Sequence, residues 1–378
     1  MAKRRANGDG LMRKRSDGRW EGRIVVGHKE NGKPIFKSVF GRTQKELLPK
    51  LEQLRRDYAG ADLTEECRMP LGEWLEQWLL EQGQRLRPAT VDGYRYCIRL
   101  INQHLAAVPL DQLKKPDVQK MYNALLDSGL SSSTVRSVHM MLHEAMDAAV
   151  RKNLIVRNPT TKATLPKKEY APVQVLNNEQ LERFLNEIRS VPAWHDLFYV
   201  ELTTGLRRGE LCGLRWEDFD ENAGRLCVCR TISYRHGKLC DGEPKTESGV
   251  RSILLPQSTA DLLRNRKRTV QSEWIFPAQS DSNLPVHPES AFKAFKRILK
   301  KADLPDLPLH ALRHTFSTQA ITAGVDPKTL SSILGHTNAS FTLNTYTHVT
   351  SDMQKHASDI IGDMAETILG KDLTPWLN

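Results

Sequence analysis

The sequence predicts a multidomain fold that is mainly α-helical with α+β parts, and three observations support this fold class. The chain has 378 residues, which is enough for about two or three domains. Short β-type runs with turn residues occur at the start, and long segments with apolar residues at helical spacing follow them. A stretch rich in proline and lysine then separates two parts of the chain. We therefore expect domains at residues 1–62, 69–157 and 174–360, a basic proline-containing linker at 158–173 and a C-terminal tail at 361–378.

The first expected domain, residues 1–62, has the pattern of a small three-stranded β-sheet followed by a helix. Turn residues separate three strand candidates, which are Gly10–Lys14, Arg19–Gly27 and Pro34–Phe40. Thr43 and Glu46 form a capping box that opens a helix towards Tyr58. Pro49 lies too deep in that helix for an ordinary first-turn proline, so we expect a kink or a late start.

The second expected domain, residues 69–157, has the pattern of a helical bundle. Large apolar residues recur at the spacing of one helix face at Trp74, Leu75, Trp78 and Leu79. Further segments with helical periodicity begin near Pro88, Pro116 and Ser131. We expect most aromatic and methionine residues of these segments to form the core.

The third expected domain, residues 174–360, mixes helices and strands. Asn177 or Asn178 caps its first helix. Further helices are expected at 194–204, 258–268, 288–302, 310–323, 327–334 and 352–369. Two strands are expected, at Arg225–Tyr234 and Val250–Leu255. Gly237 and Gly242 mark turns.

The formal net charge of +10 favours a polyanionic partner, and the charge is spread unevenly along the chain. Residues 1–45 contain 13 Lys and Arg against 4 Asp and Glu, so they carry nearly all of the excess. We prefer a sheet face laid on DNA to a solubilising basic segment, because such a charge density otherwise repels itself. The rest of the chain can bind DNA only where its charges are sorted onto one face.

The composition disfavours several classes of protein. No run of about 18 apolar residues is present, and no apolar segment follows the basic residues at the start, so neither a membrane span nor a secretory signal is expected. Six scattered cysteines do not form a disulfide framework, which favours the reducing cytoplasm. Cys227 and Cys229 are one residue apart, which differs from the two-residue spacing common in zinc sites.

The stretch from Leu309 to Tyr346, joined to Arg207 upstream, carries residues that are suited to cutting a phosphodiester. A phosphodiester under attack gains negative charge on its non-bridging oxygens, and preorganised cations stabilise that charge. Arg207 and Arg313 suit this task, since a guanidinium matches two oxygens and stays charged. Such a site needs no metal and no cofactor.

Tyr346 is the candidate nucleophile of this site. A free phenol has a pKa near about 10, so it needs a base and a cationic setting. His310 could accept the proton of the phenol, and the two arginines would favour the phenolate. Lys245, which precedes the second strand candidate, is the best-placed residue to protonate the leaving 5′ oxygen.

His310 and His314 also suggest a metal site, because residues four apart share a helix face. The metalloprotease pattern requires Glu directly after the first His, and Ala311 stands there. No Cys or Asp cluster completes a set of ligands. We therefore expect no metal, and we interpret His314 as a buried, hydrogen-bonded support.

The chain resembles the tyrosine recombinases of the phage integrase family. Thr204–Leu211 resembles the first arginine box of the family, and His310–His314 resembles the second. Leu334–His336 and Tyr346 resemble the third. These motifs are specific and stand in the family's order, and the resemblance covers about the whole chain.

The resemblance implies roles for individual residues. Six residues are implied to act directly in DNA cleavage, namely Arg207, Lys245, His310, Arg313, His336 and Tyr346. The two arginines bind the scissile phosphate, and the lysine is the general acid. His310 acts as acid or base, His336 donates to a phosphate oxygen, and Tyr346 forms a 3′-phosphotyrosyl link. Glu210 and His314 support the site.

The resemblance also implies what the domains do. Residues 1–62 resemble the arm-binding domain of conjugative-transposon and lambda-type integrases, residues 69–157 the helical, SAM-like core-binding domain, and residues 174–360 the catalytic domain. The implied activity is site-specific recombination that integrates and excises a mobile element through a Holliday junction, without ATP or metal. The expected partners are double-stranded DNA at core and arm sites, further copies of the chain (a free monomer, a homotetramer on DNA), an excisionase and a DNA-bending host factor. The expected location is the bacterial cytoplasm, on the nucleoid.

Ten basic residues of the first two expected domains are candidate DNA contacts: Arg13, Lys14, Arg19, Arg23, Lys37, Arg85, Arg87, Arg95, Arg99 and Lys120. A solvated surface charge is the alternative for each of them. Two other functions remain open, a DNA-relaxing enzyme of the type IB topoisomerase kind and a DNA-binding regulator without chemistry. The origin of the element, a phage or a conjugative transposon, also remains open.

Overall fold

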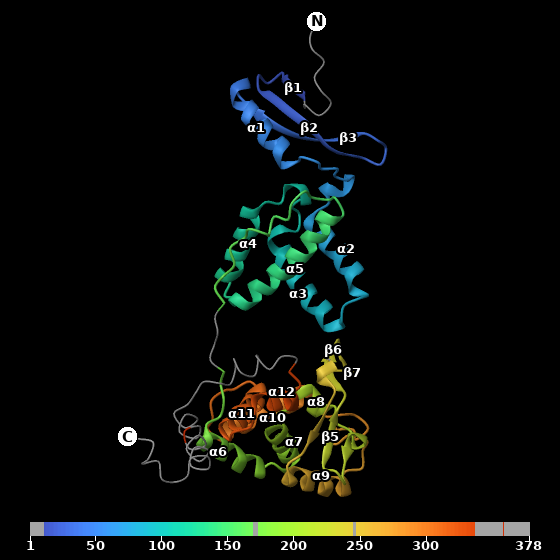
Figure 1. Ribbon diagram of the computed structural model, residues 1–378, viewed down its shortest axis with the longest axis vertical. Coiled ribbons are helices and arrows are strands. Elements are labelled where there is room, and N and C mark those ends of the chain that lie inside the picture. Colours follow the sequence, from blue (N-terminus) through green and yellow to red (C-terminus); the bar gives the residue numbers. More distant parts are fainter. Residues whose placement is uncertain (1–10, 169–172, 245–246, 337–357, 359–378) are drawn as a thin grey trace, which may run out of the picture. The chain divides into compact units, whose positions relative to one another are not determined.

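The structure, a computed structural model, describes residues 11–168, 173–244 and 247–336 together with Ser358 (Figure 1). The chain divides into two compact units, Met1–Tyr170 and Ala171–Asn378. Both units combine helices with small antiparallel sheets, so the mainly helical fold with α+β parts is confirmed. None of the helices in the described ranges is long and apolar enough to span a membrane.

An antiparallel sheet covered by one helix opens the first unit. Its strands, in the order β1-β2-β3, are β1 (Leu11–Lys14), β2 (Trp20–His28) and β3 (Pro34–Gly41). Helix α1 (Gln44–Asp57) packs on one face of this sheet (Figure 1). A Cβ on Gly22 would lie only 3.2 Å from Leu51, so the glycine in β2 allows the helix to approach closely. The three strands and the helix confirm the expected pattern.

Pro49 lies within α1 without delaying its start. The helix begins at Gln44, so the late start that this proline suggested is wrong. Thr43 Oγ1 accepts a hydrogen bond from the backbone N–H of Glu46 at 3.2 Å, which fixes the first turn. Burial of Leu47 and Leu51 against the sheet then holds the helix across the backbone hydrogen bond that the proline removes.

Four helices form the core of the rest of the first unit. They are α2 (Leu71–Gly83), α3 (Pro88–Leu105), α4 (Lys115–Asp127) and α5 (Ser132–Arg151). Trp74 and Trp78 on α2 are each only 1% exposed, as their helical spacing predicts. The indole Nε1 of Trp74 donates to the carbonyl of Ala145 on α5 at 3.1 Å, so this large ring is buried with its polar group satisfied.

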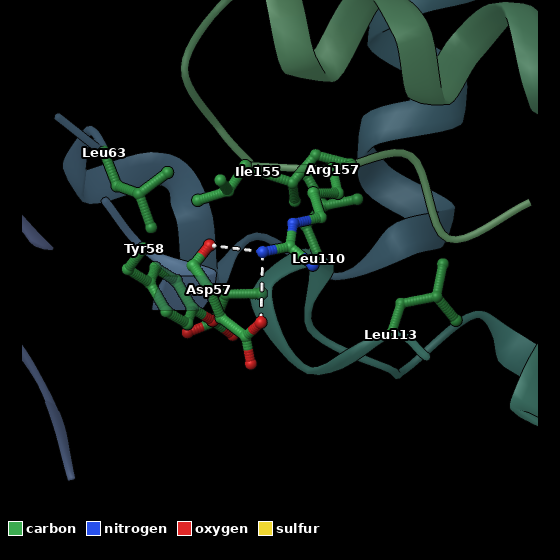
Figure 2. Close-up of a pocket in the computed structure, with 9 residues that line it drawn as sticks. Asp57, Tyr58, Leu63, Leu110, Leu113, Ile155 and Arg157 are labelled. Atoms are coloured by element: carbon green, nitrogen blue, oxygen red, sulfur yellow. Dashed lines mark hydrogen bonds and ion pairs between the residues drawn. The ribbon is translucent and has the colours of Figure 1, made fainter. Parts of the chain in front are cut away.

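Ion pairs join the sheet and helix α1 to later segments of the first unit. Lys37 on β3 donates to the carboxylate of Asp111 at 2.5 Å, and the exposed fractions of the two side chains are 19% and 6%. Arg157 donates to the carboxylate of Asp57, at the end of α1, at 3.0 Å. Figure 2 shows this second pair in a pocket of about 220 Å³. Lys37 and Arg157 therefore use their charges to join segments of the first unit that are distant in sequence.

The described part of the second unit is a layer of helices beside two small sheets (Figure 1). Its helices are α6 (Asn178–Arg189), α7 (Pro192–Thr204), α8 (Arg208–Cys212), α9 (Gln257–Thr269), α10 (Pro288–Lys301), α11 (His310–Thr322) and α12 (Pro327–Leu334). Strands β4 (Phe219–Asp220), β5 (Arg225–Val228) and β8 (Arg251–Leu254) form one sheet, and β6 (Thr231–Arg235) pairs with β7 (Lys238–Gly242) in a hairpin. The rings of Phe184, Phe198 and Phe295 meet in the core between α6, α7 and α10.

The strand expected at Arg225–Tyr234 is wrong as a single element. The chain leaves β5 after Val228 and enters β6 of the other sheet at Thr231. Between the two strands, Arg230 and Cys229 both contact the buried carboxylate of Asp218, which anchors the bend. Gly237 lies in the turn before β7, as expected, whereas Gly242, also expected to mark a turn, is the last residue of β7, which pairs with β6 along its whole length.

The expected helices of the second unit up to residue 334 are confirmed, and Asn177 rather than Asn178 is the cap of the first. The helix expected at 352–369 and the tail at 361–378 lie outside the described residues. The roles expected for residues 1–62, 69–157, 158–173 and 174–360 remain predictions.

Candidate active site

Helix α11 presents Arg313 to the interior of the second unit. The residue is only 1% exposed, and its guanidinium bonds to two other segments. Nη1 donates to the carbonyl of Gly205 at 2.7 Å, and Nη2 donates to the carbonyl of Leu334 at 2.8 Å. Nη2 also lies 2.8 Å from Nε2 of His336. Arg313 therefore ties the end of α7, the end of α12 and His336 to one point.

Arg207 reaches the same point from a different element. Gly205 ends α7 in the left-handed conformation with φ of +62°, and a Cβ there would lie 2.3 Å from the ring of Phe316. The chain turns at this glycine and places Arg207 at the start of α8. Arg207 Nη1 donates to Glu210 at 2.7 Å, and Nη2 donates to the carbonyl of Gly335 at 3.1 Å. Its side chain is 41% exposed, so it is accessible to a phosphate.

A third arginine, Arg251 on β8, belongs to the same group. Its side chain is only 7% exposed. Nε donates to the carbonyl of Ile333 at 2.5 Å, and Nη2 donates to Glu210 at 2.9 Å. The sequence analysis missed Arg251, because it stands in a strand like any surface arginine. The signal that could have revealed Arg251 is Glu210. This acidic residue lies within the first arginine motif, and a buried carboxylate requires cationic partners.

Three arginines thus bind three consecutive carbonyls at the C-terminal end of α12. Arg251, Arg313 and Arg207 donate to the carbonyls of residues 333, 334 and 335, respectively. A helix end carries partial negative charge on such carbonyls, so it attracts cations. Gly335 closes the helix with φ of +65°, and His336 follows directly beside the guanidinium groups.

The charges of this cluster do not cancel. Three guanidinium groups face one carboxylate, that of Glu210, which is 3% exposed. Burial by itself would raise the pKa of Glu210, but the hydrogen bonds and charges of Arg251 and Arg207 hold that pKa below its usual value. Glu210 is therefore ionised at neutral pH, and among the described residues that bond to one another in this cluster two positive charges remain in excess for an anionic ligand.

The histidines beside the arginines are neutral at pH 7. Loss of hydration, followed by the charges of His314 and Arg313, lowers the pKa of His310 to about 4. Burial, followed by the charges of Arg313 and Arg207, lowers the pKa of His336 to about 4. His310 is exposed as a residue, but its ring packs edge-on against that of half-buried His314 at 4.6 Å between centroids. A neutral His310 is able to accept a proton.

The hydrogen bond between Arg313 and His336 fixes the tautomer of the imidazole. Arginine has only donors, so Nε2 of His336 must accept from Nη2 of Arg313. The proton of the neutral ring is then on Nδ1. A bond from His336 to a phosphate oxygen must come from Nδ1, or from Nε2 after the bond to Arg313 breaks.

Of the six residues expected to cleave DNA, the structure brings together Arg207, His310, Arg313 and His336. Lys245 and Tyr346 lie outside the described residues. The segment after Lys245 returns close to Pro244, since a Cβ on Gly249 would lie 2.5 Å from Cβ of that proline. The carbonyl of Gly249 in turn accepts from Arg251 Nη1 at 3.0 Å.

The register of the N-terminal sheet separates the candidate DNA contacts of that domain. Arg13 pairs with Glu21 across β1 and β2, and Arg23 pairs with Leu11, so both arginines lie on the face opposite α1. Lys37 pairs with Ile24 on the helix side and is engaged by Asp111. The remaining candidates are exposed: Lys14, Arg19, Arg85, Arg87, Arg95, Arg99 and Lys120.

Comparison with known proteins agrees with this fold. The model of the phage integrase family matches residues 174–353, and the model of the phage integrase N-terminal SAM-like domain matches residues 71–126. A tyrosine recombinase XerC-like protein of Caldanaerobacter subterraneus subsp. tengcongensis is 29% identical, over 90% of this chain and 95% of the relative. The transposase from transposon Tn916 of Enterococcus faecalis is 28% identical, over 72% of each chain. The Tn1549 transposon integrase, solved in complex with a circular intermediate DNA, is 26% identical with a TM-score of 0.69, over 78% of this chain and 99% of that one.

The fold and the arginine cluster define an enzyme that breaks and rejoins DNA strands. The chain belongs to the phage integrase family of tyrosine recombinases and is a site-specific DNA recombinase. The lambda integrase shares the fold, with a TM-score of 0.61 over 93% of this chain. Both the family and the enzyme class expected from the sequence are confirmed.

Proposed function

We propose that this recombinase integrates and excises a mobile element by cleaving DNA through a 3′-phosphotyrosyl intermediate. The observation that carries the proposal is the convergence of Arg207, Arg313 and His336 at the end of α12, with an excess of positive charge. The similarity to the Tn916 transposase and to the Tn1549 integrase bound to a circular intermediate DNA supports a conjugative transposon as the element.

In the proposed reaction, Arg207 and Arg313 hold the scissile phosphate and stabilise the charge on its non-bridging oxygens. The Tyr346 oxygen attacks phosphorus, and a phosphotyrosyl bond forms while the bond to the 5′ oxygen breaks. His310, neutral at pH 7, takes the phenol proton. Lys245 gives a proton to the leaving 5′ oxygen. A 5′ hydroxyl from the partner duplex then reverses these steps.

The proposal extends to the partners of the chain. Exchange of strands between two duplexes proceeds through a Holliday junction and requires four active sites, so a homotetramer assembles on DNA from free monomers. The basic N-terminal sheet contacts arm sites, and the helical part of the first unit contacts core sites. An excisionase and a DNA-bending host factor set the direction, in the bacterial cytoplasm on the nucleoid.

Trapping on a nicked suicide substrate tests the nucleophile. The substrate is a duplex spanning the joined ends of the element, with a nick that lets the released 5′ fragment diffuse away. The wild-type chain should form a covalent protein–DNA adduct, and Tyr346→Phe should form none, because it lacks the attacking oxygen. The matched control is Tyr234→Phe on β6, a 49% exposed tyrosine outside the cluster, which should retain the adduct. An adduct with Tyr346→Phe would refute the assignment.

A further inference from the structure

We propose that Arg251 is a positioning residue of the recombination site, which keeps Arg207 available for phosphate and aligns the segment after Lys245 with the end of α12. The inference rests on the proposed function, because it assumes that the cluster binds the scissile phosphate. Nε, Nη1 and Nη2 of Arg251 already donate to Ile333, Gly249 and Glu210, respectively, so we assign it the task of holding these groups in place.

Arg251 joins segments that are distant in sequence. Its Nη2 and Nη1 bond to the two carboxylate oxygens of Glu210 at 2.9 and 3.3 Å. Nη1 also donates to the carbonyl of Gly249, and Nε donates to the carbonyl of Ile333. One rigid guanidinium therefore fixes the start of α8, the segment before β8 and the end of α12 relative to one another.

The second contribution of Arg251 is electrostatic. Glu210 Oε1 accepts from both Arg207 and Arg251, so the buried carboxylate is shared between two cations. If Arg251 were absent, Arg207 would be the main counter-ion of Glu210. The negative charge of Glu210 would then largely neutralise the positive charge of Arg207. With Arg251 present, the carboxylate is satisfied and Arg207 retains charge for the DNA phosphate.

The guanidinium of Arg251 is tightly packed against the residues around it. A Cβ on Gly335 would lie 2.9 Å from Nη1 of Arg251 and 2.9 Å from the carbonyl of Ser248. The end of α12, the guanidinium and the segment after Lys245 are therefore in contact. A shift of Arg251 would displace the carbonyls next to His336 as well as the segment that follows the general acid.

The test measures single-turnover cleavage of the suicide substrate at saturating protein, alongside DNA affinity and the unfolding midpoint. Arg251→Gln should slow cleavage about 100-fold, because a misplacement of about 1 Å has that effect, while DNA affinity stays near the wild-type value. Arg251→Lys keeps the charge and should recover part of the rate, since lysine lacks the fork that spans Glu210. This variant also keeps the test decisive if the glutamine variant does not fold.

A matched control and a double variant separate positioning from simple stability. Arg230→Gln removes another partly buried arginine, 17% exposed and paired with Asp218, so it should lower the unfolding midpoint but retain the cleavage rate. If Arg251 acts through Glu210, the double variant Glu210→Gln with Arg251→Gln should be slower than the wild-type chain by less than the product of the two single effects.

Each outcome has a definite meaning. Wild-type cleavage by Arg251→Gln or Arg251→Lys, a loss of rate that follows a loss of DNA affinity, or fully multiplicative effects in the double variant would overturn the role of Arg251. If the wild-type chain forms no adduct at all, the proposed function itself fails. The two failures are therefore distinguishable in one set of reactions.

Discussion

At the scale of single residues, two imidazoles next to the arginine cluster are held in the neutral form. Lost hydration and nearby positive charges lower the pKa of both His310 and His336 to about 4. A neutral imidazole adds no charge to the phosphate site and can accept a proton. Among the described residues of the cluster, the positive charge therefore comes from arginines, which do not titrate in the physiological range.

The first prediction at this scale concerns the acid side of the pH profile. The rate of single-turnover cleavage should fall as the pH drops towards about 4, where His310 becomes protonated and can no longer act as base. An ordinary histidine would produce this loss near pH 6.5. The measurement is the adduct rate between pH 4 and 7 at saturating DNA. An acid midpoint near 6.5 would contradict the assignment of His310 as a neutral base.

The same pKa shift links His310 to stability. Because its pKa is lower in the folded chain than in the unfolded chain, stability is present above the unfolded value and is lost as the pH falls towards about 4. His310→Gln should therefore lose less stability than the wild type between pH 7 and 5, as read from unfolding midpoints. His104→Gln, which alters an exposed histidine, is the control.

Short sequence motifs were enough to predict some residues of the arginine cluster, but not all of them. Arg207, His310 and Arg313 stand in short motifs whose chemistry is evident from the sequence. Arg251 does not, because its partners Glu210 and Ile333 are 41 and 82 positions away. Its burial and its role depend on tertiary contacts that no local pattern encodes.

At the scale of elements, the site depends on how helices end. Gly205 ends α7 with φ of +62° and offers its carbonyl to Arg313, while the ring of Phe316 occupies the place of a side chain. The turn thus connects backbone conformation directly to the position of an arginine.

Gly205→Ala should lower the free energy of unfolding by about 3 kcal/mol, from the left-handed backbone and from the overlap with Phe316. Gly224→Ala is a close control, because Gly224 has the same φ of +62° but its Cβ would meet nothing nearer than 3.8 Å. It should cost about 1–2 kcal/mol. Equal losses in denaturant unfolding would show that the contact with Phe316 is unimportant.

Elements that carry their own end signals could be predicted from the sequence. The side chains of Thr43 and Asn177 cap α1 and α6, and each accepts a hydrogen bond from the backbone N–H of the residue three positions later. These contacts are local in the chain. The break between β5 and β6 could not be predicted in this way. It depends on Asp218, which lies 11 and 12 positions before the residues that it holds.

At the scale of the whole molecule, the excess charge of the N-terminal residues divides between two purposes. Arg13 and Arg23 lie on the open face of the sheet, and Arg23 stacks over the ring of Phe36 at 4.4 Å. Lys37 lies on the other face and neutralises Asp111. The count of basic residues therefore overstates the charge that is available to DNA.

Arg23→Met and Lys37→Met should separate these two purposes. Arg23→Met should weaken binding to a duplex of about 30 base pairs and lower the salt dependence of the affinity by about one charge. Lys37→Met should leave that affinity unchanged but lower the free energy of unfolding by about 2 kcal/mol or more, because Asp111 loses its partner. The reverse pattern in salt titrations and denaturant unfolding would show that the sheet binds DNA with its other face.

Because three arginines and His336 are all linked to the end of α12, we expect the cluster to assemble or come apart as one unit. This helix has only eight residues, so it is too short to persist without its tertiary contacts. If it opens, the carbonyls that hold Arg207, Arg251 and Arg313 are lost together, and His336 departs with them. Amide hydrogen exchange in α12 would thus measure the fraction of molecules in which the arginine cluster and His336 are assembled.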